Sequence, residues 1–412
     1  MRRNPLLFCL IIFIFFIISF LTNIIGPLVP DIIKSFNLSL KMASFLPLSF
    51  FAAYGLMSIP SGFLIELFGE KKIILTAFTL ASIGAFIFAN VGTFGFYLFS
   101  LFLIGTGMAM LQVAINPLLR TVGGEREFAF NSVLGQMFFG LASFISPLVY
   151  SYIITNVSND SRSSNPIINS LSNLILPEME WISLYWIFAI ISSLMVLLIS
   201  LIKIPAVEKK DDEKIGAIET HFKLLKNPVV ILYFIAIFSY VGTEVGIANW
   251  ISQFLETYHN VNPQLEGAKT VSNFWGMMTL GTLLGLVLLK FIDSRKVLVF
   301  NSIVSIITLL IALFGSSEQA MIAFPIIGFF IATMWSIIIS LALNSMPDSH
   351  GSFSGILVTG IIGGALVPFF VGSIGDLLEL KIGMLFLIFT LLYILLVGFW
   401  AKPLINNTAR KI

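Results

Sequence analysis

The stretch LLFCLIIFIFFIISFLTNIIGPLV, from Leu6 to Val29, contains no charged side chain. A helix needs about 20 predominantly apolar residues to cross the hydrocarbon core of a bilayer, which is about 30 Å thick. The stretch therefore predicts a transmembrane helix. Arg2 and Arg3 precede it as in a secretory signal peptide, but its apolar part is much longer than the core of such a peptide, so we expect the helix to be retained.

Similar apolar runs recur along the whole chain. Of its 412 residues, 58% are hydrophobic and 11% are charged, and the mean hydropathy is +1.00, whereas an ordinary soluble domain has about 25% charged residues. Such a chain cannot cover a water-facing surface, and the sequence predicts an all-α membrane protein with twelve transmembrane helices. The twelve runs are Leu6–Val29, Ala43–Phe68, Ile73–Asn90, Phe94–Leu119, Phe130–Ile154, Leu184–Ile204, Val229–Leu255, Thr270–Phe291, Val297–Gly315, Met321–Leu343, Phe353–Leu378 and Ile382–Ala401.

The longest charged stretch divides these helices into six and six. It begins with PAVEKKDDEK, from Pro205 to Lys214, and continues to about Lys226. A run of charges of this kind is typical of a solvated linker. The predicted organisation is an N-terminal half over residues 1–204, a cytoplasmic linker over 205–227 and a C-terminal half over 228–412.

The basic residues indicate how the helices are oriented, because membrane insertion keeps Lys and Arg on the cytoplasmic side. If the N-terminus is cytoplasmic, 18 of the 23 basic residues fall in inner loops and tails. The five in outer loops are Lys34, Lys41, Arg162, Lys269 and Lys381. Together with a bias toward Ile, Phe, Lys and Asn, this predicts a multi-pass protein of the bacterial cytoplasmic (inner) membrane with both termini in the cytoplasm. The net charge of +2 reflects the same bias and indicates no affinity for nucleic acid.

The residues needed for a metal site or for catalysis do not come together in the sequence. Cys9 is the sole cysteine, and His221, His259 and His350 fall in loops that are far apart. Metal ligands must converge on one point, and no nucleophile–histidine pair or phosphate-binding loop is present either. We expect no enzyme activity, no metal and no cofactor. The expected partners are a small-molecule substrate and the lipid bilayer, for a protein acting as a monomer.

One acidic residue lies deep inside an apolar run. The stretch FSYVGTEVGIANW, from Phe238 to Trp250, places Glu244 at membrane depth, where an ionisable group is costly and is a candidate functional group. All Lys and Arg are assigned to loops and tails, so none is expected within the bilayer to neutralise it, and a proton or a sodium ion is expected to accompany it. This predicts an ion-coupled symporter. Two other interpretations stay open, namely a protonated Glu bonded to a backbone carbonyl between helices and a carboxylate facing a water-filled vestibule.

Two loops resemble the signature loop of the major facilitator superfamily. GFLIELFGEKK, from Gly62 to Lys72, has its glycines, acid and basic pair, and the loop after Gly285 is an eroded counterpart in the second half. The resemblance implies two pseudo-symmetric six-helix halves that rock about a midplane site. It also implies a cytoplasmic gate, although a short basic turn would give a similar pattern. The predicted gate residues are Glu66, Lys71, Lys72, Asp293 and Arg295.

Four further motifs resemble the fucose permease and glucose/galactose transporter branch of that superfamily, and they cover nearly the whole chain in order. They are LQVAINPLLRTVGG from Leu111, NSVLGQMFFG from Asn131, YVGTEVGIANW from Tyr240 and GGALVPFFVGSIGD from Gly363. The resemblance implies import of a small neutral sugar, a hexose or deoxyhexose, together with a proton or sodium ion.

The chain also departs from this branch. Fucose permease carries one acid on its fourth helix and another near the outer end of its first, where this sequence has Gln112 and Gly26. A proton relay through the N-terminal half therefore cannot be carried over. Glu244 remains as the predicted ion-coupling residue, at a position where glucose/galactose members are also acidic.

A polar sugar needs hydrogen-bonding partners, and an amide side chain both donates and accepts. Taken singly, a transmembrane Asn or Gln more often joins two helices, a Trp near a helix end is more often an interfacial anchor, and Asn116-Pro117 is more typical of a helix break. Trp275 and Trp335 are further candidates for stacking on the sugar. The predicted substrate contacts are Gln112, Gln136, Asn249, Trp250, Asn23 and Asn116.

Two competing functions remain to be weighed. A lone acid in an apolar cavity could attract a lipophilic cation, as in a proton-coupled multidrug exporter. Such a site should be rich in aromatic residues and poor in amides, whereas the amides predicted on helices four, five and seven favour a polar ligand. A receptor or scaffold role is not supported, because no loop is large enough to form a signalling domain.

Overall fold

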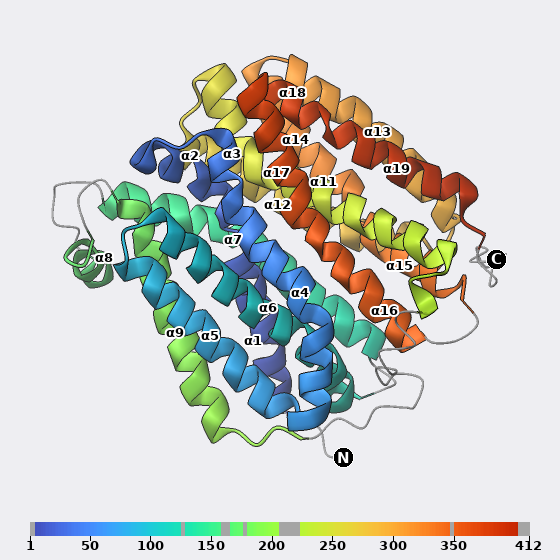
Figure 1. Cartoon of the computed structure of the whole chain (residues 1–412), viewed down its shortest axis with the longest axis horizontal. Helices are drawn as coiled ribbons and strands as arrows, with labels where there is room; N and C mark the ends of the chain where they lie inside the picture. The colour runs from blue at the N-terminus through green and yellow to red at the C-terminus, as the bar shows by residue number, and fades with distance from the viewer. Residues whose placement is uncertain are drawn as a thin grey trace.

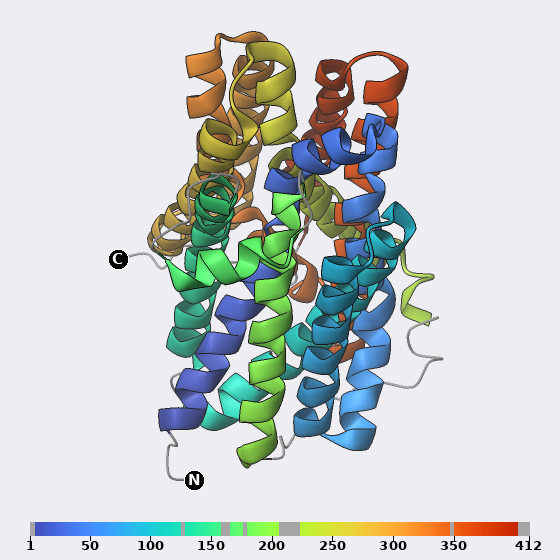
Figure 2. The same cartoon turned by 90° about the vertical axis from the view of Figure 1, so that its left-hand side faces the viewer.

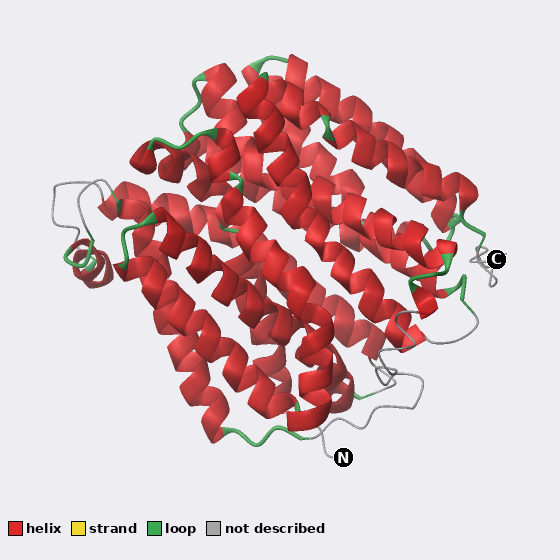
Figure 3. Cartoon of the chain, in the orientation of Figure 1, coloured by secondary structure: helices red, strands yellow, loops and turns green. Residues whose placement is uncertain are grey.

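The computed structural model describes residues 5–124, 128–157, 165–175, 179–205, 223–346 and 350–402. Helices joined by short loops make up this part of the chain (Figure 3). Twelve of its helical segments are long and apolar enough to cross a membrane, which confirms the predicted fold. Most of the charged linker, residues 206–222, lies outside the described residues.

The helices form two groups that lie side by side, blue to green and yellow to red in the colouring by residue number (Figures 1 and 2). The first group consists of α1 (Pro5–Thr22), α2 (Ile25–Phe36), α3 (Leu40–Ala43), α4 (Phe45–Phe68), α5 (Glu70–Asn90), α6 (Phe94–Gly123), α7 (Phe128–Val157), α8 (Pro166–Ser172) and α9 (Ser183–Leu201). The second consists of α11 (Pro228–His259), α12 (Ala268–Leu288), α13 (Ser294–Phe314), α14 (Ser317–Ile331), α15 (Met334–Leu343), α16 (His350–Thr359), α17 (Gly363–Leu377), α18 (Leu380–Leu385) and α19 (Leu387–Trp400). Short helical turns η2 (Glu180–Ile182), η4 (Pro263–Gly267) and η5 (Gly360–Ile362) connect some of them.

Two faces of the bundle are needed to describe the site. We call the face at which α1 begins and α19 ends the terminal face, and the other the opposite face. Because successive spans alternate in direction, α7 and α11 begin at the terminal face, whereas α2 and α17 end at the opposite face.

The first span is broken between α1 and α2, at Asn23 and Ile24. Pro27 explains the break, because in a continuous helix its missing N–H group would have bonded the Asn23 carbonyl, whereas proline is tolerated in the first turn of a new helix. The side chain of Asn23 is held at this point, where Nδ2 donates to Ser143 Oγ at 2.8 Å and to Ser19 Oγ at 3.2 Å. The break therefore places a polar side chain in the middle of an apolar span.

Candidate substrate-binding cavity

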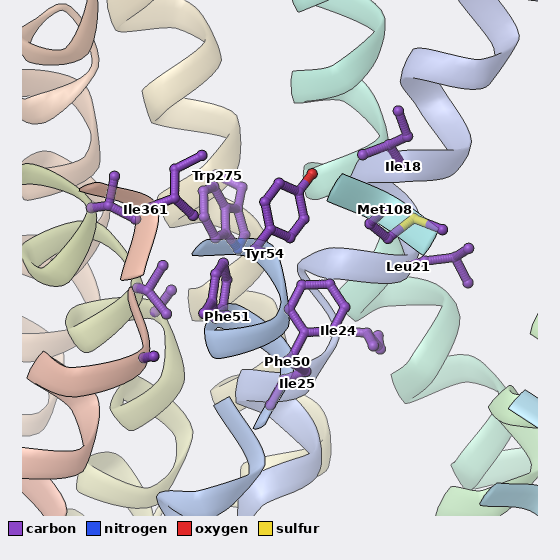
Figure 4. Close-up of a cluster of buried hydrophobic side chains, with 14 of the residues drawn as sticks. Ile18, Leu21, Ile24, Ile25, Phe50, Phe51, Tyr54, Met108, Trp275 and Ile361 are labelled. Atoms are coloured by element: carbon purple, nitrogen blue, oxygen red, sulfur yellow. The ribbon is translucent and has the colours of Figure 1, made fainter. Parts of the chain in front are cut away.

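A cavity of about 430 Å³ lies between the two groups of helices. This volume falls within the range of small-molecule sites, roughly 300–1,000 Å³. The N-terminal half lines it from the α1–α2 break, α4, α6 and α7, and the C-terminal half from α11, α12, α15 and η5. Figure 4 shows side chains of both halves in this region, including Tyr54 of α4, Trp275 of α12 and Ile361 of η5.

Three of the predicted substrate contacts meet on the N-terminal wall of the cavity. Gln112 of α6, Gln136 of α7 and Asn23 all line it. The Tyr54 hydroxyl donates to Gln112 Oε1 at 2.9 Å, which leaves the amide nitrogen of Gln112 as a donor for a ligand. Tyr54 was not predicted, because a tyrosine in an apolar span carries no signal of its own for a cavity position.

Glu244 lies on the C-terminal wall of the same cavity. Tyr240 precedes it by one helical turn on α11 and is its side-chain hydrogen-bonding partner. The Tyr240 ring in turn lies 6.0 Å from the Trp335 ring, centroid to centroid. Among the described residues that line the cavity none is Lys or Arg. The carboxyl group therefore faces the cavity with a hydroxyl group and aromatic rings around it, and without a basic side chain.

Trp275 and Trp335 both line the cavity, where their rings could pack against a ligand. Trp275 is almost fully buried, and its indole N–H has no hydrogen-bond partner among the described residues. A donor of this kind at a cavity wall is available to an oxygen atom of a ligand.

Asn249 and Trp250 do not line the cavity. Asn249 lies five positions after Glu244 in the sequence, which is about 7.5 Å along a helix, toward the opposite face. Both side chains are buried, and Trp250 Nε1 donates to the Pro368 carbonyl at 3.3 Å. Asn116 is exposed one turn from Gln112 toward the terminal face, and it is also absent from the cavity lining.

Polar contacts join the two halves at the opposite face. The carboxylate of Asp376, at the end of α17, accepts the backbone N–H groups of Leu40 and Lys41 at 2.7 and 3.0 Å. Lys34 of α2 forms an ion pair with Glu256 of α11. These contacts connect the segment around α2 and α3 with two helices of the other half.

Asp31 adds a buried contact at the same face. Its Oδ1 accepts from Gln264 Nε2 of η4 at 2.8 Å, and its Oδ2 accepts from the Tyr150 hydroxyl of α7. Asp31 is 7% exposed and lies within a membrane-spanning segment, so Glu244 is not the only acid at such a position. The sequence prediction missed it because the first apolar run was ended at Val29, whereas α2 continues to Phe36.

The cavity extends toward the terminal face. Its lining extends to Ser132 and Val133 near the beginning of α7, and to Leu283 and Leu286 near the end of α12. Together with the contacts between the halves at the opposite face, this lining indicates a state that is closed at the opposite face and accessible from the terminal face.

The predicted gate residues lie at the terminal face, where Lys71, Asp293 and Arg295 make contacts within their own half. Lys71 Nζ donates to the Ser200 carbonyl of α9 at 3.0 Å, while Glu66 and Lys72 are exposed. Asp293 accepts the Arg295 backbone N–H at 2.8 Å as the N-cap of α13 and pairs with the Arg295 side chain at 3.2 Å. Partial burial raises the pKa of Asp293, but the hydrogen bonds and charge of Arg295 outweigh it and hold that pKa below its ordinary value.

Sequence and structure comparisons agree with this architecture. Residues 11–367 match the Major Facilitator Superfamily. The chain is 30% identical over 368 residues to a putative glucose/galactose transporter of Helicobacter pylori, covering 89% of this chain and 88% of the relative. It is 28% identical over 394 residues to a glucose/galactose transporter of Brucella abortus, covering 93% of this chain and 91% of the relative.

The L-fucose-proton symporter of Escherichia coli is a third relative, 24% identical over 387 residues, covering 90% of this chain and 86% of the symporter. A crystal structure of a variant of the Escherichia coli fucose:proton symporter superposes with a TM-score of 0.68 at 23% identity, covering 97% of this chain and 100% of that structure. These matches confirm the predicted resemblance and the expectation that the protein is a transporter and not an enzyme. With a family match over most of its length and twelve membrane-spanning helices around a central cavity, the chain belongs to the Major Facilitator Superfamily.

Proposed function

We propose that this transporter imports a small neutral sugar, a hexose or deoxyhexose, by symport with a proton or sodium ion through alternating access. The observation that carries the proposal is the composition of the cavity, which places Gln112, Gln136 and Asn23 on one wall and Glu244 on the other. The names of the three relatives, glucose/galactose transporters and an L-fucose-proton symporter, support the same substrate class.

The cavity suits an uncharged polyol. Each sugar hydroxyl both donates and accepts a hydrogen bond, as do the amides of Gln112, Gln136 and Asn23. The indole rings of Trp275 and Trp335 supply apolar faces against which the C–H side of a sugar ring can pack. Asn116, one turn beyond Gln112, would lie on the path from the cavity to the terminal face.

Glu244 is the proposed ion-coupling residue. A carboxylate at membrane depth without a basic neighbour is stabilised by a bound proton or sodium ion. If its access to that ion differs between the two states of the transporter, movement of the ion drives movement of the sugar. Tyr240, one turn before Glu244 on α11, provides a hydroxyl group beside the carboxyl group where it faces the cavity.

The proposed setting is the cytoplasmic membrane of a bacterium, with both termini in the cytoplasm and the protein acting as a monomer. The terminal face is then cytoplasmic, and the structure corresponds to the state that releases sugar into the cell. In this scheme Glu66, Lys71, Lys72, Asp293 and Arg295 act when the terminal face closes.

A screen of glucose, galactose and fucose, with and without sodium, tests the substrate class directly. A ligand that binds the folded protein raises its apparent melting temperature, and the cavity tryptophans should report binding by fluorescence. No thermal or fluorescence response to any of these sugars would contradict the proposal.

Replacing Glu244 by Gln tests the coupling. The amide keeps the size of the side chain but cannot exchange a proton and holds sodium weakly, so we expect sugar counterflow to persist while accumulation against a gradient is lost. Both are measured in the same proteoliposomes, with Thr243→Val on the same helix as a control. Concentrative uptake equal to that of the parent would show that the carboxyl group is structural.

A proton-coupled exporter of lipophilic cations is the second candidate. The aromatic rings of Tyr240 and Trp335 beside Glu244 favour it, because a cation is attracted to aromatic faces. Tetraphenylphosphonium separates the two functions. Transport of this cation, without binding of any sugar, would favour the exporter.

A further inference from the structure

Two amide side chains on adjacent turns of α11 are buried without full hydrogen bonding. Asn249 is 4% exposed and Gln253 is 9% exposed. Asn249 Nδ2 and Gln253 Oε1 have no hydrogen-bond partner among the described residues. Buried polar atoms in native proteins nearly always have partners, so an apolar residue would suit the closed state better at either position.

These amides continue the cavity wall toward the opposite face. Val245 lines the cavity, and Asn249 and Gln253 follow it at successive intervals of four residues. Residues four apart lie above one another on one face of a helix. The two amides therefore lie along the line by which a molecule would pass between the cavity and the opposite face.

In the present state, α2 of the other half covers this line. A Cβ atom at Gly26 would overlap the Ala248 carbonyl oxygen and lie 3.2 Å from Asn249 Cα. Three residues after Gln253, Glu256 is paired with Lys34 of α2. The side of α11 that carries the amides is thus closed by direct contact with α2.

We propose that Asn249 and Gln253 form an outer subsite, which binds hydroxyl groups of the sugar when the opposite face opens. The inference rests on the proposed function for its substrate class. Once α2 moves away, each amide can donate to and accept from sugar hydroxyls. The unpaired amide atoms destabilise the closed state relative to the open state. In the open state, hydrogen bonds to the sugar would give these atoms the partners that they lack in the closed state.

Gly26→Val provides a background in which to test the subsite. Because even a Cβ at position 26 meets backbone atoms of α11, valine should prevent closure of the opposite face. Asp31→Ala, which removes the acceptor of the Gln264 bond between the halves, opens the same face in a second way. Affinities for glucose, galactose and fucose are measured by fluorescence in these backgrounds, with and without Asn249→Leu or Gln253→Leu.

We expect each leucine to weaken sugar binding about tenfold or more in the open backgrounds. The control is Thr243→Val on the same helix, because Thr243 bonds Ser239 and Thr390 within its own half. The sugar affinity of this variant should equal that of its background. Unchanged affinity in both leucine variants would overturn the subsite while leaving the proposed function intact. If neither the parent nor the open backgrounds bind any of the sugars, the proposed function fails, and the subsite with it.

A thiol-labelling measurement checks the opening independently of any sugar. In a Cys9→Ser chain carrying Asn249→Cys, a membrane-impermeant maleimide is added from the side of the opposite face. Labelling should be much faster after G26V or D31A is added than with Gly26 and Asp31 in place. Equally slow labelling in all three chains would overturn the proposal, because position 249 would then never meet the solution on that side.

Discussion

The two faces of this transporter use their charged residues differently. At the opposite face, Asp31, Lys34 and Asp376 make contacts that cross from one half to the other. At the terminal face, Lys71 bonds α9 and Arg295 bonds Asp293, each within its own half. The difference teaches that contacts between the halves identify the closed side of the bundle, whereas a gating role for the loops that resemble the family signature stays a prediction.

The contacts at the closed face differ in strength. Asp31 is buried and accepts two hydrogen bonds, and bonds to a charged group are worth about 1.5–3 kcal/mol each. The Lys34 and Glu256 side chains are 60% and 22% exposed, and an ion pair so open to solvent contributes roughly 0–1 kcal/mol. Asp31 should therefore dominate the closure.

The largest expected effect follows from Asp31→Ala. It removes the acceptor of the Gln264 bond, which crosses between the halves, and this should cost the closed state about 1.5–3 kcal/mol, or roughly tenfold to a hundredfold in the balance between the faces. Maleimide labelling of a cysteine at position 249 measures this balance. Asp31→Asn, which keeps an oxygen acceptor, should have a smaller effect, and equal labelling of Asp31→Ala and the parent would remove Asp31 from the closure.

Substitutions within the cavity should weaken sugar binding without changing how tightly the opposite face is closed. Gln112→Ala and Gln136→Ala each remove an amide partner, at a cost of about 1–3 kcal/mol in sugar binding, while the labelling at position 249 without sugar stays that of the parent. Fluorescence titration gives the affinity. Normal affinity in both folded variants would exclude these residues from the site.

Exchanging the charges of Lys34 and Glu256 should give a smaller effect. The double variant Lys34→Glu with Glu256→Lys restores the attraction that either single change removes. The balance between the two faces, measured by labelling at position 249, should then return to that of the parent. Because the pair is exposed, the single-variant effects should be at most about 1 kcal/mol and should fade as salt is raised. A double variant as impaired as the singles would show that the geometry of the original pair matters more than its charge.

The smallest effects are expected for the terminal-face charges in the present state. Since the pKa of Asp293 is depressed, its contribution to capping α13 is complete above its ordinary pKa of about 3.9 and is lost as the pH falls through the lower folded value. At neutral pH, Asp293→Asn, Arg295→Gln and Lys71→Gln should slow turnover without changing the order of sugar affinities. Transport rates and competition assays check this, and a change of preferred sugar would argue against a gating role.

Much of the fold followed from the sequence, because twelve apolar runs of membrane-spanning length leave few alternatives. The side chains that face the cavity were harder to predict. A span in lipid is apolar on all sides, so its sequence carries little signal for the side that faces the cavity, and Tyr54 and Tyr240 were missed for that reason. Gln112, Gln136, Asn23 and Glu244 were found because polar residues stand out in such spans.

The positions of Asn249 and Trp250 outside the cavity depend on the conformational state of the transporter, which the sequence does not specify directly. A transporter has at least two packings, and a residue that meets the substrate path in one can be buried between the halves in the other. Both residues are buried near the closed face in this structure. Asp31 was missed because the prediction ended the first helix before it, whereas the break at Asn23 allows a second helix to begin and carry the chain onward.

The break at Asn23 also separates two roles of the first span, because the part before it contacts α7 at the cavity and the part after it contacts the other half. The bonds of Asn23 to Ser19 and Ser143 anchor α1 to α7 at the cavity, whereas Asp31 and Lys34, which hold the other half, lie beyond the break on the twelve-residue α2. A short helix that begins at a break can tilt without moving the helix before it, and the bond of Asp31 to Tyr150 meets α7 about two turns beyond Ser143. Opening the outer end of the span would then leave the amides of the cavity in place, and the sugar would meet a preformed site on arrival.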